Sequence, residues 1–212
     1  MTSATESLRV GFVPGVILTK WRRVWEERFP AVALEPAEVA LADQRRLLLD
    51  GTLDMCFVRR PIEQEGLHII PLYDEVVVAW AAKEHPVAAF DEITLADLAD
   101  ERVLDDADQV SIDAAVAEVA VLRVPMSIAR THNRRDLVYR PIVDAPPSSV
   151  GLAWLRDNDS PWIEEFIGVV RGRTVNSSRT AAERSTQPTK APAPRPAKPK
   201  PKPARPTGKR RR

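Results

Sequence analysis

The chain has a single cysteine, Cys56, and its 212 residues contain no apolar run of about 18 residues. One cysteine excludes an intramolecular disulfide and fits a reducing compartment. The lack of a long apolar run argues against a transmembrane helix, and the polar residues 1–7 lack the apolar core of a signal peptide. We therefore expect a soluble, cytoplasmic protein with no membrane partner.

The sequence also lacks the motifs that usually mark an enzyme. It contains no nucleophile elbow, P-loop, GxGxxG pattern or recognisable metal-binding motif, and His68, His85 and His132 are widely separated. Cys56 lies inside a predicted strand, where a core role is the simplest interpretation. We therefore expect no catalytic residues, no bound metal, no cofactor and no enzymatic activity.

Charge is distributed very unevenly along the chain. Residues 171–212 hold 14 lysines and arginines but a single acid, Glu183, whereas residues 1–170 hold 17 basic and 29 acidic residues. The first part therefore carries a net charge of −12 and the last part +13, which the overall value of +1 conceals. This asymmetry indicates an acidic globular body followed by a basic tail, and basic tails commonly bind polyanions.

The tail, residues 171–212, is expected to be disordered. Eight of its residues are proline, and Val175 is its only large apolar residue, so it cannot bury enough apolar area to offset the entropy of ordering. Its cations could contact nucleic-acid phosphates without sequence preference. Alternatively, the tail could fold back on the acidic body or only aid solubility. The candidate nucleic-acid-binding residues are Lys198, Lys200, Lys202, Arg205, Lys209, Arg210, Arg211 and Arg212.

The first 60 residues alternate between strand and helix patterns. Buried strands are predicted over 8–13, 32–35 and 53–58, and amphipathic helices over 17–29, with Ile17 facing inward, and over 41–50. This β-α-β-α-β order predicts a parallel sheet with helices on its faces.

Shorter elements follow. Strands are predicted over 68–72, 75–82, 102–104, 121–124, 137–140 and 150–155, and helices over 94–98, 111–119, 127–132 and 160–170. In the helix over 111–119, Ser111 is expected to be the N-cap and Val119 to face inward. Residues 130–135 form a basic patch, which could contact phosphates, pair with acidic residues or form a solvated loop.

Several segments, in this order and spacing, resemble the effector-binding (substrate-binding) domain of LysR-type transcriptional regulators. They are LRVGFVP at 8–14, FPAVAL at 29–34, LLLDGTLDMCFVR at 47–59, EHPVA at 84–88, ITLADLADE at 93–101 and PMSIAR at 125–130. The resemblance covers roughly residues 8–170 and depends on the order of these segments rather than on any one motif.

The resemblance implies an α/β fold like that of periplasmic binding proteins, with two lobes, two crossover strands and a ligand cleft between the lobes. By this analogy residues 1–7 are a disordered N-terminus, lobe one is about 8–79 plus 150–170, and a shortened lobe two is about 80–149. The family also has a winged helix-turn-helix and a linker helix before this domain. Since the family-like strand starts at Leu8, neither is expected here.

The function implied is small-molecule sensing in transcription-related regulation. The candidate arginines, Arg59 and Arg60, favour an anionic effector. The basic tail would add non-specific nucleic-acid contact. A stand-alone solute-binding or protein-interaction module with no DNA role is the alternative, and assembly as a homo-oligomer is left open.

The candidate effector-binding residues lie at predicted strand ends and helix starts. Backbone N–H groups in the turn at 14–16 could bind a carboxylate, and arginines at the carboxyl end of a parallel strand could bind an anion. Ordinary loops, surface salt bridges and helix caps remain the simpler alternatives. The candidates are Pro14, Gly15, Val16, Thr19, Arg59, Arg60, Asp108, Gln109 and Ser111.

Overall fold

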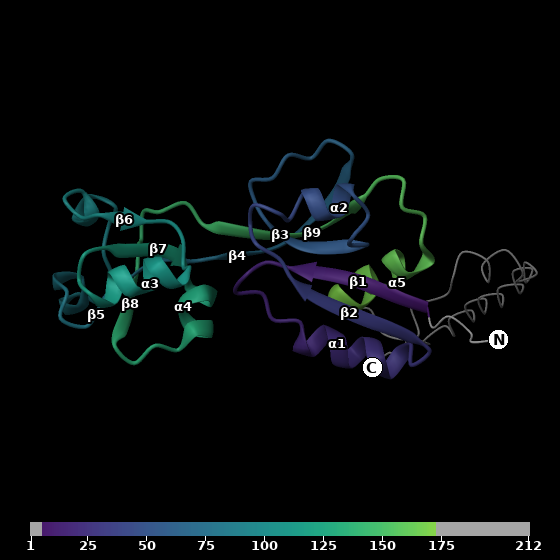
Figure 1. Cartoon of the computed structure of the whole chain (residues 1–212), viewed down its shortest axis with the longest axis horizontal. Helices are drawn as coiled ribbons and strands as arrows, with labels where there is room; N and C mark the ends of the chain where they lie inside the picture. The colour runs from purple at the N-terminus through teal and green to yellow at the C-terminus, as the bar shows by residue number, and fades with distance from the viewer. Residues whose placement is uncertain (1–5, 173–212) are drawn as a thin grey trace, which may run out of the picture. The chain divides into compact units, whose positions relative to one another are not determined.

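The computed structural model describes residues 6–172. Residues 1–5 and the tail from residue 173 onward lie outside this range, and so do the predictions made for them. All eight candidate nucleic-acid-binding residues belong to this part of the tail. The described part is built on two β-sheets, each with helices on its faces (Figure 1).

The first sheet has five strands in the order β2-β1-β3-β9-β4. They are β1 (Glu6–Phe12), β2 (Val32–Glu38), β3 (Met55–Arg59), β4 (Leu67–Glu75) and β9 (Ser148–Leu155). Strands β2 and β3 both pair with β1 in parallel, which confirms the predicted β-α-β-α-β unit, whereas β9 pairs antiparallel with both β3 and β4. We call this sheet and its helices lobe one.

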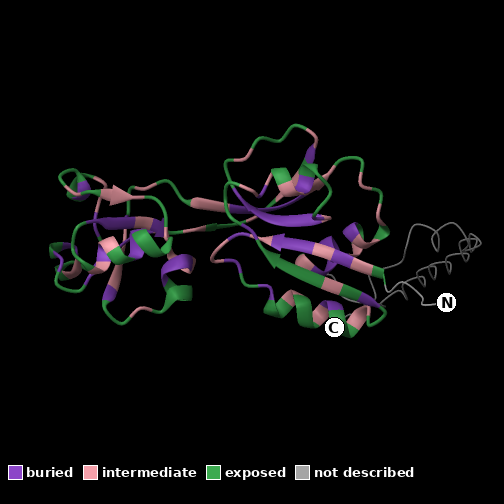
Figure 2. Cartoon of the chain, in the orientation of Figure 1, coloured by how far each residue is buried: buried purple, intermediate pink, exposed green. Residues whose placement is uncertain are grey.

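The alternation of side chains along β3 gives lobe one two apolar layers. Met55 and Phe57 pack in one core cluster, whereas Cys56 and Val58 pack in another, because successive strand residues point to opposite faces. The helices of the first layer are α1 (Thr19–Arg28) and α5 (Pro161–Val170), and α2 (Arg46–Leu49) covers the second. Figure 2 shows the buried residues concentrated in the central strands.

The first layer is dominated by aromatic rings. Trp25 is fully buried and its indole N–H donates a hydrogen bond to the Val32 carbonyl at 2.9 Å, so this large side chain leaves no polar atom unpaired. Trp21 stacks on Phe57 with ring centroids 4.6 Å apart, and Phe166 of α5 packs edge-on against Trp25. These contacts fix both helices against the sheet.

The second sheet has four strands in the order β6-β7-β5-β8. They are β5 (Val77–Ala82), β6 (Val103–Leu104), β7 (Val121–Pro125) and β8 (Leu137–Pro141). The helices α3 (Gln109–Val116) and α4 (Met126–His132) pack on one face, and the short 3₁₀ turns η1 (Pro86–Ala89) and η2 (Ala96–Leu98) pack on the other. We call this sheet and its helices lobe two.

Two connections join the lobes. Val76 alone separates β4 of lobe one from β5 of lobe two, and residues 142–147 lead back from β8 to β9 (Figure 1). The first sheet thus ends at Glu75 and the second begins at Val77, slightly before the boundary near residue 79 that the resemblance implies.

None of the helices within residues 6–172 has the length and hydropathy that spanning a bilayer requires.

Some elements differ from the prediction. The helix predicted over 41–50 is helical only over Arg46–Leu49, and turns precede it. Ser111 is not the N-cap of α3. Asp108 takes this role, because its Oδ1 accepts the Ser111 backbone N–H at 2.7 Å and the helix begins earlier, at Gln109.

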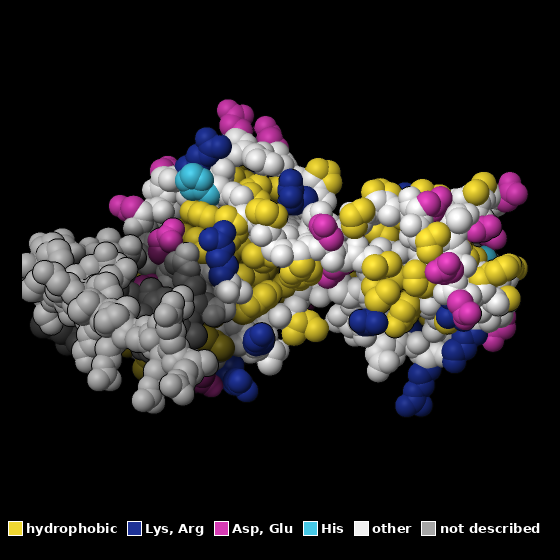
Figure 3. All heavy atoms as spheres, turned by 180° about the vertical axis from the view of Figure 1, so that it is seen from behind, with side chains coloured by type: hydrophobic (Ala, Val, Ile, Leu, Met, Phe, Trp, Pro, Cys, Tyr) yellow, Lys and Arg dark blue, Asp and Glu magenta, His cyan; other side chains and the backbone are white. Residues whose placement is uncertain are grey.

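Two apolar residues that were expected to face inward are exposed instead. Ile17 lies before α1 begins and is 68% exposed, and Val119 lies after α3 ends and is 54% exposed. Helical periodicity does not apply outside a helix, so their directions are set by the connecting loops. Apolar side chains are scattered among charges of both signs on the face drawn in Figure 3.

Candidate ligand-binding cleft

A cavity of about 1020 Å³ lies between the two lobes, and we call it the inter-lobe cavity. On the side of lobe one it is lined at the carboxyl ends of three strands, by Pro14 after β1, by Glu38 and residues 40–42 at the end of β2, and by residues 59–61 at the end of β3. This edge is where open parallel sheets bind ligands. Lobe two contributes residues 105–108 before α3 and residues 123–125 of β7.

Arg59 lines this cavity, but its guanidinium is held by the protein. Nη1 donates to Glu75 Oε2 at 2.9 Å and to Ser148 Oγ at 2.8 Å, and Nη2 donates to the Pro14 carbonyl at 3.1 Å. The side chains of Arg59 and Glu75 are only 9% and 12% exposed. Gln44 also exchanges two hydrogen bonds with the Arg59 backbone. Arg59 therefore joins the ends of β1 and β3 to both crossover connections.

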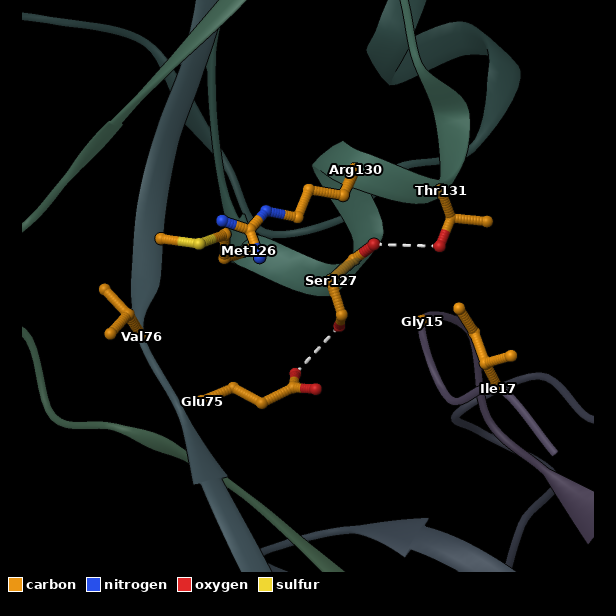
Figure 4. Close-up of a pocket in the computed structure, with 8 residues that line it drawn as sticks. All are labelled: Gly15, Ile17, Glu75, Val76, Met126, Ser127, Arg130 and Thr131. Atoms are coloured by element: carbon orange, nitrogen blue, oxygen red, sulfur yellow. Dashed lines mark hydrogen bonds between the residues drawn. The ribbon is translucent and has the colours of Figure 1, made fainter. Parts of the chain in front are cut away.

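The same network reaches lobe two through Glu75. Its Oε2 atom also accepts a hydrogen bond from Ser127 Oγ at 2.8 Å, and Ser127 lies in the first turn of α4. Figure 4 shows this pair beside Gly15, with Thr131 one helical turn further along donating to the Ser127 carbonyl. A change in the position of α4 relative to lobe one would thus disturb the Arg59–Glu75 pair.

Gly15, in the first β-α loop, lies against α4. Its φ is +88°, and a Cβ atom at this position would collide with Ser127 Oγ. Both observations favour glycine here, the first because L-residues rarely adopt this backbone conformation and the second because the space is already occupied.

We predict that Gly15→Ala destabilises the protein by about 1 kcal/mol more than Gly51→Ala does. Gly51 is the matched control, because its φ is also positive, at +71°, but no heavy atom other than those of Gly51 and its two chain neighbours lies within 4 Å of the place that a Cβ atom would take. It therefore reports backbone strain alone. The free energy of unfolding, measured in urea, compares the two. Equal losses would show that Gly15 does not pack against α4.

Three guanidinium groups line the inter-lobe cavity, and two of them have a carboxylate partner. Arg59 pairs with Glu75, and Arg123 pairs with both oxygens of Asp105, at 2.6 and 2.8 Å. The side chain of Arg60 is exposed and has no hydrogen-bond or ion-pair partner within residues 6–172. Arg60 is therefore the cation of this cavity that remains available to a ligand.

The wall formed by lobe two is acidic. Asp106 and Asp108 both line the cavity and are exposed. Hydrogen bonds from the backbone and side chain of Ser111 lower the pKa of Asp108, so it is ionised at neutral pH. Ala40, Leu41 and Leu95 supply apolar surface between the charges. The cavity thus presents the free cation of Arg60 together with the exposed carboxylate of Glu38 on the lobe-one wall, and the carboxylates of Asp106 and Asp108 on the lobe-two wall.

The structure brings together only some of the candidate effector-binding residues. Pro14, Arg59, Arg60 and Asp108 line the inter-lobe cavity, whereas Gly15 lines a smaller neighbouring pocket of about 370 Å³. The remaining four do not line either cavity. Val16 is buried in the core, Thr19 begins α1, Gln109 bonds to Asp113, and Ser111 is buried beneath its own helix start.

Several lining residues have no counterpart among the sequence candidates. Glu38 could have been found, because it ends a parallel strand at the same sheet edge as Arg59. Arg123 and Asp105 carry no such signal, since their pairing depends on a contact between segments 18 residues apart.

Cys56 is buried, which raises its pKa to about 12, so it stays a protonated thiol in the core.

Two α/β lobes joined by two crossover connections, with a cavity between them at the carboxyl edge of a parallel unit, form the two-lobe fold of periplasmic binding proteins. The model of the LysR substrate binding domain matches residues 2–109. The chain belongs to this family.

The relatives of this chain include the HTH-type transcriptional regulator AlsR of Bacillus subtilis and the Hca operon transcriptional activator HcaR of Escherichia coli. AlsR is 24% identical to this chain, and the match covers 74% of this chain and 61% of AlsR. HcaR is also 24% identical, and the match covers 80% of this chain and 68% of HcaR. The match thus spans less than two thirds of AlsR. Among solved structures, the BenM effector binding domain with its effector benzoate has a TM-score of 0.69 at 19% identity, covering 80% of this chain and 92% of that domain.

Proposed function

We propose that this chain is the effector-sensing part of a LysR-type transcriptional regulator and that its effector binds in the inter-lobe cavity. The observation that carries this proposal is the free guanidinium of Arg60 in a cavity of about 1020 Å³ at the carboxyl edge of the lobe-one sheet. A cavity of this size can enclose a small organic molecule, since typical ligand pockets measure roughly 300–1000 Å³. Family membership and the benzoate named with the BenM domain support an effector role.

The charges of the cavity favour a particular kind of effector. An anionic group would find an unpaired cation at Arg60, and a cationic or hydrogen-bond-donating group would face Asp106 and Asp108. A purely anionic molecule would meet the acidic wall unfavourably. We therefore propose a small effector with an anionic group at one end and a donor or cationic group at the other.

Binding would be reported through the Arg59–Glu75–Ser127 network. Because this network joins both crossover connections to α4, an effector that changes the lobe angle must change its geometry. The folded domain in this proposal is about residues 8–170, as the resemblance implies, extended to Glu6 by β1 and with the lobe-one sheet ending at Glu75 rather than near residue 79. The regulator is proposed to work in the cytoplasm.

The tail is the second part of the proposal. Its 14 basic residues would contact nucleic-acid phosphates without reading sequence, and would hold the sensing domain near DNA. The charge asymmetry between residues 1–170 and 171–212 supports this role over a purely solubilising one.

The effector proposal predicts the behaviour of Arg60→Gln. A library of small carboxylates and amino-carboxylates is screened by thermal shift, and calorimetry then gives the affinity of the best ligand. Arg60→Gln should weaken that affinity by about 1.5–3 kcal/mol, the scale for losing a hydrogen bond to a charged group. Arg22→Gln is the control, because Arg22 is exposed on α1 and pairs with Glu26.

Two results would contradict the effector proposal. The first is an equal affinity in the Arg60→Gln variant and the unchanged protein. The second is a library in which no member raises the melting temperature. If simple carboxylates raised the melting temperature more than amino-carboxylates did, Asp106 and Asp108 would not contribute to effector binding.

A further inference from the structure

A second polar cavity, of about 400 Å³, lies on lobe two between α4 and β8. It shares no lining residue with the inter-lobe cavity. Its polar lining consists of Arg130, Asn133, Arg134, Tyr139 and Arg140, and we call it the arginine pocket. Two of its walls are set by the fold, because Arg130 lies in the last turn of α4 and Arg140 lies in β8.

Only one of the three guanidinium groups in the arginine pocket is neutralised. Arg134 donates to both oxygens of Asp136, at 3.0 and 2.7 Å, and this pairing lowers the pKa of Asp136 to about 2. Arg130 donates instead to the Tyr139 hydroxyl at 3.3 Å and lies over its ring. Arg140 donates to the backbone carbonyls of Tyr139 and Ala88, at 3.1 and 2.7 Å.

The pocket therefore holds two positive charges that lack a carboxylate partner in the described part of the chain. Arg140 is partly buried, and its Nε atom is buried without a hydrogen-bond partner. Withdrawing a charge from water without a counter-ion is unfavourable, and a bound anion would offset that cost. The surrounding residues 1–170 carry a net charge of −12, so this local excess of cations runs against the charge of the body.

We propose that the arginine pocket binds a phosphate group, either as inorganic phosphate or as the phosphate ester of a small molecule. Arg130, from α4, and Arg140, from the edge strand β8, both line the pocket without a carboxylate partner in the described part of the chain, and the planar donor fork of arginine suits phosphate oxygens. The Asn133 amide and the Tyr139 hydroxyl line the same space and can add hydrogen bonds. The volume admits a phosphate with a small substituent, and this favours a small ligand over a duplex.

The test is calorimetry on the full chain with inorganic phosphate and with phenyl phosphate, at constant ionic strength. Arg130→Gln should weaken binding of either probe about ten-fold, the loss expected for one hydrogen bond to a charged group. Asp136→Asn should tighten binding, because it releases Arg134 from its ion pair. A variant that merely unfolds cannot bind more tightly, so this gain separates a site from a structural role.

The tail and general changes of surface charge are controlled in the same experiment. The tail is present in every variant, so its contribution cancels in the comparison. Arg22→Gln should leave phosphate binding unchanged, because Arg22 lies on α1 and lines neither the arginine pocket nor the inter-lobe cavity. Tighter binding of phenyl phosphate than of phosphate would identify an ester as the ligand, and the reverse would identify the free ion. Unchanged binding in both Arg130→Gln and Asp136→Asn, or no binding by the unaltered chain at millimolar phosphate, would overturn the proposal.

Discussion

Replacing Arg59 with alanine is expected to destabilise the protein by about 3–5 kcal/mol, because it leaves the buried carboxylate of Glu75 without its counter-ion. Both side chains are nearly buried, and the guanidinium also satisfies Ser148 and the Pro14 carbonyl. Urea unfolding of the variant, compared with the unaltered chain, measures the loss in the free energy of unfolding. A smaller loss is expected for the variant Arg59→Ala/Glu75→Ala, since neither buried charge then remains.

Arg46→Ala is the matched control for Arg59. Arg46 also forms ion pairs, with Asp43 and Asp50, but its side chain is 61% exposed. Such surface pairs contribute about 0–1 kcal/mol, so this variant should unfold close to the unaltered chain. If Arg59→Ala costs no more than Arg46→Ala, then the Arg59–Glu75 pair is not the connection between the lobes that we infer.

Removing residues 171–212 is expected to weaken binding to duplex DNA by at least about 100-fold at low salt, because the 14 basic residues of the tail leave with it. The affinity of the unaltered chain should fall with salt by a slope of about −0.9 for each phosphate contacted. Fluorescence anisotropy on two unrelated duplexes, at several salt concentrations, gives both quantities.

The isolated tail provides the control for this deletion. As a peptide of residues 171–212 it should bind more tightly than the whole chain, because residues 1–170 carry a net charge of −12 that opposes binding. Unchanged binding after the deletion would place the DNA contact in the body of the protein. A strong preference for one duplex would also contradict the proposal, because point charges on phosphates do not read base sequence.

The elements of lobe one could be predicted because their signals are local. The apolar run over 53–58 is long enough for a buried strand, and its alternation between two core clusters follows directly from strand geometry. The order of strands and helices then places the ends of β1, β2 and β3 on one edge of the sheet. For this reason Pro14, Arg59 and Arg60 could be assigned to the cleft from the sequence.

The availability of each charge in the cleft could not be predicted, because it depends on contacts between distant segments. Arg59 looks like a free anion-binding arginine in the sequence, but Glu75, 16 residues away, and Ser148, 89 residues away, occupy its guanidinium. Arg60 is left free beside it. The prediction of Ser111 as the N-cap of α3 was wrong for a more local reason. Asp and Ser are both favourable N-cap residues, and which of Asp108 and Ser111 caps the helix depends only on where the helix begins.

Nuclear magnetic resonance mapping of the best ligand from the carboxylate and amino-carboxylate screen tests the central claim most directly. If the effector binds in the inter-lobe cavity, the largest backbone amide shifts should fall at residues 38–42 and 59–60 of lobe one and at 105–108 of lobe two. Smaller shifts should reach Glu75 and Ser127 through the network with Arg59. Shifts confined to the arginine pocket, or to one lobe away from these segments, would contradict the assignment of this cavity as the effector site.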